Sequence, residues 1–195
     1  SRIEGTVATF SDLIKFESLK IKEQRDVEEV NNYVLALEYG MENMKTGDIS
    51  LNLMKDIHGI LMKNVRGERA RPGEFRDGKV WIGHPGSSIL EAKYVPPTHS
   101  EMYACLEEFE EYLNSRTSLP PLVNAALIHY QFEAIHPFFD GNGRIGRLLI
   151  VFYLHREGLL PRPYLYLSSY FEKHRREYYD LLLRLSEKGN WNEWI

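Results

Sequence analysis

A nearly continuous apolar segment at residues 120–135 constrains the fold more than any other feature of this chain. Its apolar residues would occupy most sides of a helix (Leu122, Val123, Ala126, Leu127, Ile128, Phe132 and Ile135). A helix that is apolar on most sides has to be covered by other elements. We therefore predict that this segment is the central helix of a bundle.

Apolar residues elsewhere recur at the helical steps of three and four. One such series, from Val27 to Met44, predicts a helix that ends at Thr46-Gly47, and Ser50 is the candidate N-cap of a second helix. Further helices are expected over residues 100–115, from Asn142 to about Gly158, and after Ser169, with Glu172 as its capping-box partner. The predicted fold class is mostly α.

Residues 71–86 break the helical pattern because they are rich in turn formers. Asp77-Gly78 is a hairpin signal, and Val80-Trp81-Ile82 has high β propensity. A small β-hairpin on a helical protein is the expected structure. It could serve only as a connection, or it could bind an extended peptide by strand addition.

Length and composition limit the class of protein. With 195 residues, 43% of them hydrophobic, we expect one domain with a substantial core. The net charge of −4 gives no basic surface for nucleic acid, and no run approaches the roughly 18 apolar residues of a membrane span. The single cysteine, Cys105, excludes an intrachain disulfide framework and fits a reducing, cytoplasmic location. Its apolar neighbours favour a core thiol over a nucleophile.

Features at both ends of the chain indicate a fragment of a longer protein. The chain lacks an initiating Met. Near the other end, Gly189 is typical of a helix stop, and Asn190 with Glu193 is typical of a new N-cap and its capping box. The apolar face that follows has no continuation.

The window of residues 136–147 concentrates side chains suited to phosphate chemistry. Pro137 cannot extend the preceding helix, so His136 should lie at or just beyond its C-terminus, where it can act as a general base. Asp140-Gly141-Asn142-Gly143 then makes a tight turn into the next helix. The amides at a helix start point outward and bind anions.

Two arginines and a carboxylate complete this site. Arg144 and Arg147 are three residues apart on the first turns of the helix, and their guanidinium groups suit a di- or triphosphate. Asp140 is placed where it could hold Mg²⁺ that bridges phosphate oxygens. The residues alone thus favour a phosphate-handling site.

The window resembles the signature of the Fic (Fic/Doc) family, His-x-Phe-x-[Asp/Glu]-Gly-Asn-Gly-Arg-x-x-Arg, with every specified position filled. Three other segments agree with this resemblance: residues 128–135 directly before the window, Arg71-Pro72-Gly73 before the predicted hairpin, and Tyr94-Val95-Pro96-Pro97 before a predicted helix. The resemblance implies a Fic-type helical bundle with a small β-hairpin flap. Most Fic proteins transfer AMP from Mg-ATP to a Ser, Thr or Tyr hydroxyl of a target protein.

The resemblance also assigns roles to residues. His136 would be the general base, Phe138 a core anchor and Asp140 the metal ligand. The nucleotide would be bound by the rest of the motif and by two tyrosines: Gly141, Asn142, Gly143, Arg144, Ile145, Gly146, Arg147, Tyr178 and Tyr179. Residues 79–83 would be the flap that aligns the target segment as an added strand (Lys79, Val80, Trp81, Ile82 and Gly83).

The N-terminus carries a second resemblance. Residues 1–5 look like the inhibitory motif [Ser/Thr]-x-x-x-Glu-[Gly/Asn] of Fic proteins, although its first residue would precede Ser1. Glu4 would then pair with Arg147 and restrain activity; a solvated carboxylate is the alternative. We accordingly predict an N-terminal segment at residues 1–20 with an inhibitory helix, and a catalytic domain at residues 21–195.

Several alternatives stay open. The same site could mainly remove AMP, or the chain could be a nucleotide-sensing regulatory module with little catalysis. Its expected partner is a protein substrate, with neither membrane nor nucleic acid, and a homodimer is an open alternative. His129 could form a metal pair with His136, but a hydrogen-bonded core histidine is preferred because no third ligand is evident. Glu133 could orient His136 or be a surface carboxylate.

Overall fold

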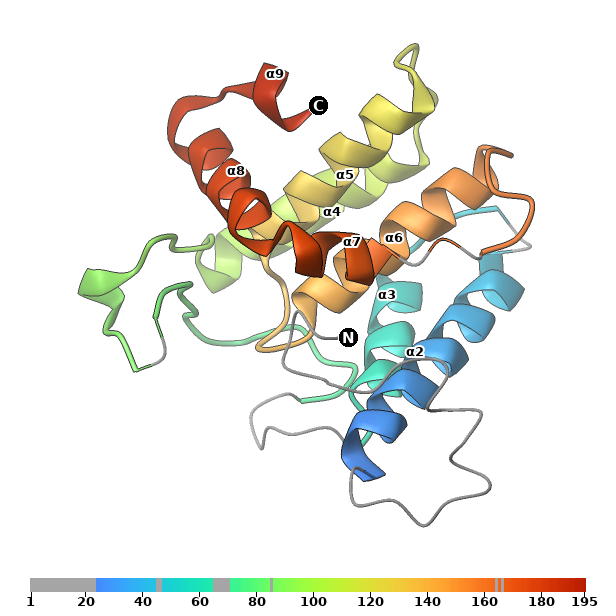
Figure 1. Cartoon of the computed structure of the whole chain (residues 1–195), viewed down its shortest axis with the longest axis horizontal. Coiled ribbons are helices and arrows are strands. Elements are labelled where there is room, and N and C mark those ends of the chain that lie inside the picture. The colour runs from blue at the N-terminus through green and yellow to red at the C-terminus, as the bar shows by residue number, and fades with distance from the viewer. Residues whose placement is uncertain (1–23, 45–46, 65–70, 85, 164, 166) are drawn as a thin grey trace.

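The computed structural model describes residues 24–44, 47–64, 71–84, 86–163, 165 and 167–195. Helices dominate this part of the chain (Figure 1), and η3 is a short 3₁₀ helix. Their bounds are α2 Gln24–Asn43, α3 Leu51–Leu61, η3 Ile89–Glu91, α4 His99–Asn114, α5 Pro121–Ile135, α6 Asn142–Arg156, α7 Leu167–Lys173, α8 Arg175–Lys188 and α9 Trp191–Trp194. The predicted mostly α fold is confirmed.

Helix α5 was predicted to be the centre of the bundle, but α6 is buried on more sides, and Leu122 of α5 is exposed. Helix α5 packs most extensively against α6 and also against α4, while α2 and α3 pair beside α6. The apolar side chains of α5 and α6 are buried in one core cluster (Ile128, Phe132, Ile135, Leu148, Leu149 and Phe152). Figure 1 shows α7, α8 and α9 on the opposite side of α6 from α2 and α3.

Polar caps fix where several helices begin. Ser50 accepts a hydrogen bond of 3.1 Å from the Leu53 amide at the start of α3, as predicted. At the start of α4, the Glu101 carboxylate accepts hydrogen bonds from the amide (2.8 Å) and hydroxyl (2.6 Å) of Thr98. These caps satisfy amides that the helix itself leaves without partners.

The predicted β-hairpin is not seen in the described residues of the 71–98 segment. The pairing there is an isolated antiparallel bridge between Ile82 and Tyr94, so Asp77-Gly78 does not close a two-stranded ladder. The residue before this turn is engaged elsewhere, because the Arg76 amide donates to the Pro137 carbonyl oxygen at 2.8 Å. Tertiary contacts have overridden the local turn signal.

The helix expected after Ser169 is also different. Ser169 lies inside α7, so its predicted capping box with Glu172 is wrong. His174 (φ −108°, ψ 25°) interrupts the helical run, and α8 begins at the next residue. Near the chain end, Gly189 stops α8 in the left-handed conformation as predicted (φ 63°). The capping box of Asn190 does not form, because the Glu193 carboxylate binds Arg184 at 2.9 Å.

Among the described helices, none combines the length and apolar character needed to cross a bilayer.

Candidate functional site

His136 lies directly after α5 and adopts the left-handed conformation (φ 50°, ψ 60°). Its amide donates to the Phe132 carbonyl oxygen at 3.0 Å, so it ends the helix as the following proline predicted. Its ring Nδ1 lies 3.3 Å from the carbonyl oxygen of Glu133. That contact is made with Nδ1 as donor, which leaves Nε2 as the proton acceptor.

The environment keeps the His136 imidazole neutral. Burial is the main cause that lowers its pKa, the Glu133 carbonyl opposes the shift, and the positive charge of Arg76 adds to it, which together give a pKa of about 4. A histidine must be neutral to accept a proton, and this ring is neutral throughout the physiological pH range. The arrangement fits a general base.

The loop between His136 and α6 is closed by one side chain. Asn142 accepts a hydrogen bond from the Phe138 amide (2.9 Å) and donates one to the Phe138 carbonyl (2.8 Å). Gly141 is the N-cap of α6 with φ 80°, a conformation that favours glycine. We call residues 138–143 the anion loop, because it presents the first amides of α6.

His58 of α3 packs against the anion loop and was not predicted from the sequence. Its ring stacks on Phe138 with centroids 3.8 Å apart, and its Nε2 lies 3.0 Å from the Asp140 carbonyl oxygen. Gly141 has no room for a side chain here, because a Cβ would come within 2.8 Å of the Met62 sulfur. No sequence signal identified His58, since it belongs to an ordinary amphipathic helix.

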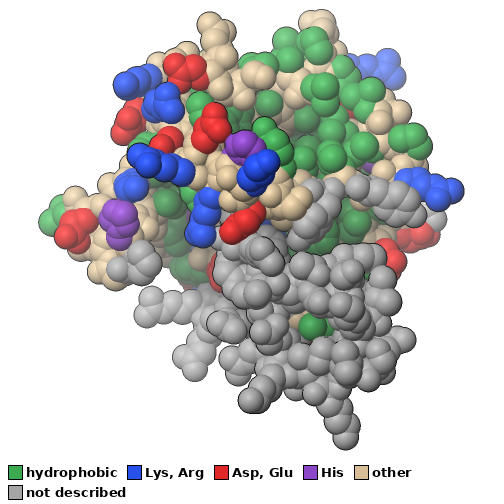
Figure 2. Space-filling model, viewed as in Figure 1, with side chains coloured by type: hydrophobic (Ala, Val, Ile, Leu, Met, Phe, Trp, Pro, Cys, Tyr) green, Lys and Arg blue, Asp and Glu red, His purple; other side chains and the backbone are tan. Residues whose placement is uncertain are grey.

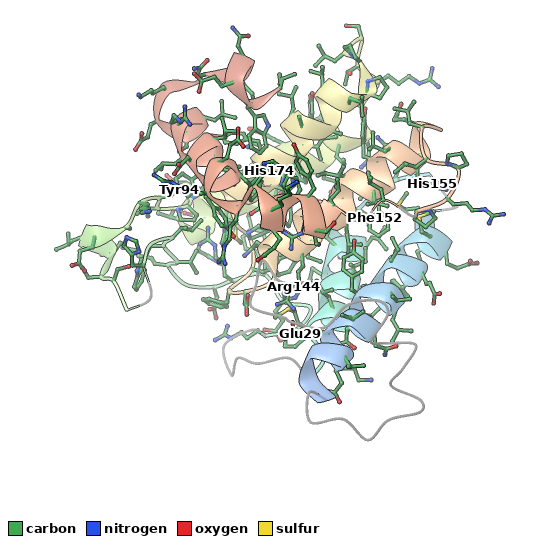
Figure 3. The ribbon with its side chains drawn as sticks, in the orientation of Figure 1. Glu29, Tyr94, Arg144, Phe152, His155 and His174 are labelled. Atoms are coloured by element: carbon green, nitrogen blue, oxygen red, sulfur yellow. The ribbon has the colours of Figure 1, made fainter. Side chains whose placement is uncertain are left out.

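The two motif arginines take different positions, although their spacing predicted a shared face. Arg147 lines a pocket beside His136. The Arg144 guanidinium instead lies between the carboxylates of Glu29 on α2 (3.7 Å) and Asp140 (3.8 Å), and Figure 3 shows Glu29 and Arg144 together. Its predicted phosphate contact remains a prediction.

The pocket has a volume of about 530 Å³ and brings most of the predicted site together. Predicted residues that line it are Trp81, Ile82, Gly83, His136, Asp140, Gly141, Asn142, Gly143, Arg147, Tyr178 and Tyr179. Predicted residues that do not line it are Lys79, Val80, Arg144, Ile145 and Gly146. Glu4 lies outside the described residues.

Charged side chains gather on the left half of the face shown in Figure 2, and apolar ones gather at its upper right.

Ile145 and Gly146 serve packing in this structure. Ile145 is buried in the core. A Cβ on Gly146 would meet Glu133 Oε1 at 2.5 Å and His129 Nδ1 at 3.0 Å. Gly146 therefore permits the close approach of α5 and α6 beneath the pocket.

His129 is the core histidine that the sequence favoured over a metal ligand. It is buried, and its Nε2 lies 2.9 Å from the Tyr178 hydroxyl. Burial lowers its pKa to about 3, with Arg147 adding to the shift. The contact fixes Tyr178 in the wall of the pocket. Glu133 also lines the pocket, but it orients His136 through its carbonyl oxygen.

A magnesium ion fits the anion loop through a single carboxylate. The described residues contain no group of three or more His, Cys, Asp or Glu side chains that could hold a metal. Mg²⁺ in nucleotide sites, however, is held by one or two carboxylates, by phosphate oxygens and by water. Asp140 is half exposed at the pocket, and its Oδ1 accepts from the Gly141 amide at 2.6 Å. The Gly141 amide thus holds one oxygen of a carboxylate that lines the pocket.

Two family models match the chain. The model of the Fic/DOC family matches residues 48–154, which include the anion loop and His136. A model described as the N-terminal part of the same family matches residues 1–42.

Curated relatives and solved structures agree with the two family models. Proteins named protein adenylyltransferase Fic, from Drosophila willistoni and Drosophila melanogaster, are each 29% identical over 96% of this chain. The chain spans 36% of the length of these relatives. A Fic family protein from Desulfovibrio desulfuricans G20 superposes with a TM-score of 0.79 at 25% identity, covering 98% of this chain and 56% of that chain. A fragment of Fic-1 from C. elegans gives 0.64 at 22% identity, covering 80% and 46%, a likeness of fold alone.

Proposed function

The chain belongs to the Fic/DOC family, and on that premise we propose that it transfers AMP from Mg-ATP to a hydroxyl side chain of a target protein. The observation that carries the proposal is the meeting of His136, Arg147 and the first amides of α6 at one pocket. The name of the longer Drosophila relatives, protein adenylyltransferase, supports the same activity.

The proposed chemistry begins at the Nε2 of His136. This atom takes the proton of the target hydroxyl, because Nδ1 is turned to the Glu133 carbonyl. The hydroxyl oxygen attacks the α-phosphorus of ATP and forms a phosphodiester bond, while the bond from the α-phosphorus to the pyrophosphate oxygen breaks. Pyrophosphate leaves with the electron pair of that bond.

The phosphates would be held by the anion loop and Arg147. Backbone amides at the start of α6 suit the negative charge, and the guanidinium of Arg147 suits the distal phosphate oxygens. Asp140 would hold Mg²⁺, which supplies positive charge to the phosphates and the leaving group. Arg144 could add a phosphate contact only by moving from Glu29, so we assign it mainly to holding Asp140.

The target segment would lie along residues 79–83. The amide of Ile82 donates to the Tyr94 carbonyl at 2.8 Å, and the carbonyl of Ile82 accepts from the Lys93 amide at 2.8 Å. In an extended segment, the backbone groups of neighbouring residues point to the opposite edge. Trp81, which precedes Ile82 and lines the pocket, therefore offers that edge to an added strand.

We further propose that Glu4 restrains the activity by pairing with Arg147. The resemblance of residues 1–5 to the inhibitory motif and the N-terminal family match at residues 1–42 support this assignment. A carboxylate on Arg147 would compete with the distal phosphate for the same guanidinium. Glu4→Gly should then raise auto-AMPylation, and Glu38→Gln, which changes an exposed glutamate of α2, should not.

The test uses two forms of labelled ATP. Lysate proteins are incubated with the Glu4→Gly variant and ATP labelled on either the α- or the γ-phosphate. AMP transfer predicts incorporation of the α-label alone. Incorporation of the γ-label would indicate phosphotransfer, and absence of both labels would favour a nucleotide-sensing module.

A further inference from the structure

The carbonyl groups at the end of α5 receive donors from one distant segment. The last carbonyls of a helix lack partners within it and must find them elsewhere. The Ala134 oxygen accepts from the Tyr94 hydroxyl (2.9 Å), and the Pro137 oxygen accepts from the Arg76 amide (2.8 Å). Both donors belong to residues 71–98, which also contain the flap.

The Arg76 side chain completes this pattern. Its Nε donates to the His136 oxygen at 2.8 Å, and one terminal nitrogen lies 3.3 Å from the Ile135 oxygen. The same guanidinium donates to the oxygens of Gly78 (3.1 Å) and Pro97 (2.5 Å). One side chain thus joins the end of α5 to both ends of the segment that borders the pocket.

Arg76 is fully buried, with 0% exposure. Among the described residues it forms no ion pair with a carboxylate, so carbonyl oxygens surround its charge. A buried charge is tolerated only when hydrogen bonds satisfy it, and the C-terminus of α5 adds the negative end of a helix dipole. Arg76 is therefore specific to this arrangement of carbonyls.

We propose that Arg76 is a positioning residue for His136, and that it couples the turn carrying the base to the flap. The inference rests on the proposed function. His136 has φ 50°, a conformation that non-glycine residues adopt only when the surroundings hold them there. The hydrogen bonds of Arg76 to the carbonyls of Ile135, His136 and Pro137 supply that constraint.

The coupling has a clear structural path. Trp81, Ile82 and Tyr94 line the pocket, and Tyr94, labelled in Figure 3, both pairs with Ile82 and donates to Ala134. Burial raises the pKa of Tyr94 to about 12, so its hydroxyl remains a donor. A target strand that orders the flap would therefore also fix the end of α5.

The experiment compares Arg76→Gln with Arg156→Gln, both in the Glu4→Gly chain. Arg156 is a matched control because its guanidinium donates to the Leu113 oxygen (2.6 Å) and to Asn114 Oδ1 (2.9 Å) at the end of α4. With α-labelled ATP, Arg76→Gln should lower kcat by about 10²-fold, the effect expected of a misplaced catalytic group, and leave the KM for ATP nearly unchanged. Arg156→Gln should leave both constants near those of the parent. Equal kcat values for the two variants would overturn the proposal.

Two further variants keep the test decisive if Arg76→Gln does not fold. Arg76→Lys retains the positive charge but loses the guanidinium group that donates to several carbonyls at once. We expect kcat to fall, while the pH at which kcat declines on the acid side stays unchanged. Tyr94→Phe keeps the ring and removes only the bond to Ala134, so kcat should fall several-fold. Parent-like kcat in both variants would contradict the coupling.

A second readout does not depend on catalysis. The proton NMR titration of His136 should move to higher pKa in Arg76→Gln and stay unchanged in Arg156→Gln, because only the first removes the nearby charge. The other charged residues that line the pocket are kept (Lys93, Glu133, Asp140, Arg147, Arg175 and Asp180). If the parent shows no AMP transfer, the proposed function fails, and an unmoved His136 resonance would separately overturn the role of Arg76.

Discussion

His58 donates a hydrogen bond from Nε2 to the main-chain oxygen of Asp140, over 3.0 Å. The direction follows from its other nitrogen, because Nδ1 accepts a hydrogen bond of 2.9 Å from the Gly73 amide. A neutral ring can serve both partners only with the proton on Nε2. This fully buried side chain therefore links α3, the turn at Gly73 and the anion loop.

Replacing His58 should destabilise the protein strongly. His58→Ala removes both hydrogen bonds and the stacking on Phe138, and it leaves a cavity. We expect the free energy of unfolding to fall by about 2–4 kcal/mol in urea denaturation. His155→Ala is the control, because His155 is only partly buried and its ring nitrogen contacts the Leu160 oxygen. Similar losses in both variants would contradict the role of His58.

Stability should fall with acid before the carboxylates titrate. Burial lowers the pKa of His58 to about 4 and that of His129 to about 3, below the unfolded value near 6.5. The unfolded chain then binds more protons, so stability is full above pH 6.5 and is lost as pH falls toward the folded pKa values. Between pH 7 and 5 we expect a loss of roughly 2 kcal/mol for each histidine.

Urea denaturation at several pH values tests this dependence. His129→Gln removes one titrating group, so its stability should fall less steeply between pH 7 and 5. A wild-type protein with equal stability at pH 7 and 5 would show that these histidines are not held neutral by the fold.

Adding one methyl group at Gly146 should strain the packing of α6 against the buried His129 ring of α5. The new Cβ would lie 2.5 Å from Glu133 Oε1 and 3.0 Å from His129 Nδ1, so we expect Gly146→Ala to cost about 1–3 kcal/mol. Gly59→Ala is the matched control in α3, where the nearest atoms lie at an ordinary 3.7 Å. That variant should gain roughly 0.5–1 kcal/mol from helix propensity. Thermal unfolding of the two variants measures the loss of stability in the first and the gain in the second. A Gly146→Ala protein as stable as the parent would refute the tight contact.

The helices and the loop that follows His136 could be predicted from local sequence. The periodic apolar residues of α2 to α6 determine which face each helix buries, and the motif at residues 136–147 is local in the chain. His136 therefore lies where Pro137 predicted. The helix N-caps at Ser50 and Gly141 likewise depend on neighbouring residues.

The residues that support the site could not be predicted in this way. Arg76 and His58 contact backbone carbonyls 59 to 82 residues away. Every residue carries such a carbonyl, so the identity of a residue does not show that its carbonyl is a contact. The Asp77-Gly78 signal failed for the same reason, since Arg76 is held by the end of α5. The different positions of Arg144 and Arg147 depend on α2, because Glu29 lies beside the first of them.

Asn142 should be essential for the anion loop. Asn142→Ala removes both bonds to Phe138 and leaves two buried backbone groups without partners, each costing about 1–3 kcal/mol. We expect weaker ATP binding in calorimetric titrations together with lower stability. Asn43→Ala is the control, because Asn43 donates from an exposed position to the Tyr39 oxygen. An unchanged dissociation constant for ATP would contradict the role of the loop.

The most direct measurement is AMP transfer by His136→Ala in the Glu4→Gly chain, followed with α-phosphate-labelled ATP. We expect that the variant binds ATP, unfolds cooperatively and transfers AMP at least about 10²-fold more slowly than its parent, the lower range for loss of a general base. Transfer at the parental rate by a folded His136→Ala protein would contradict the assignment of the base.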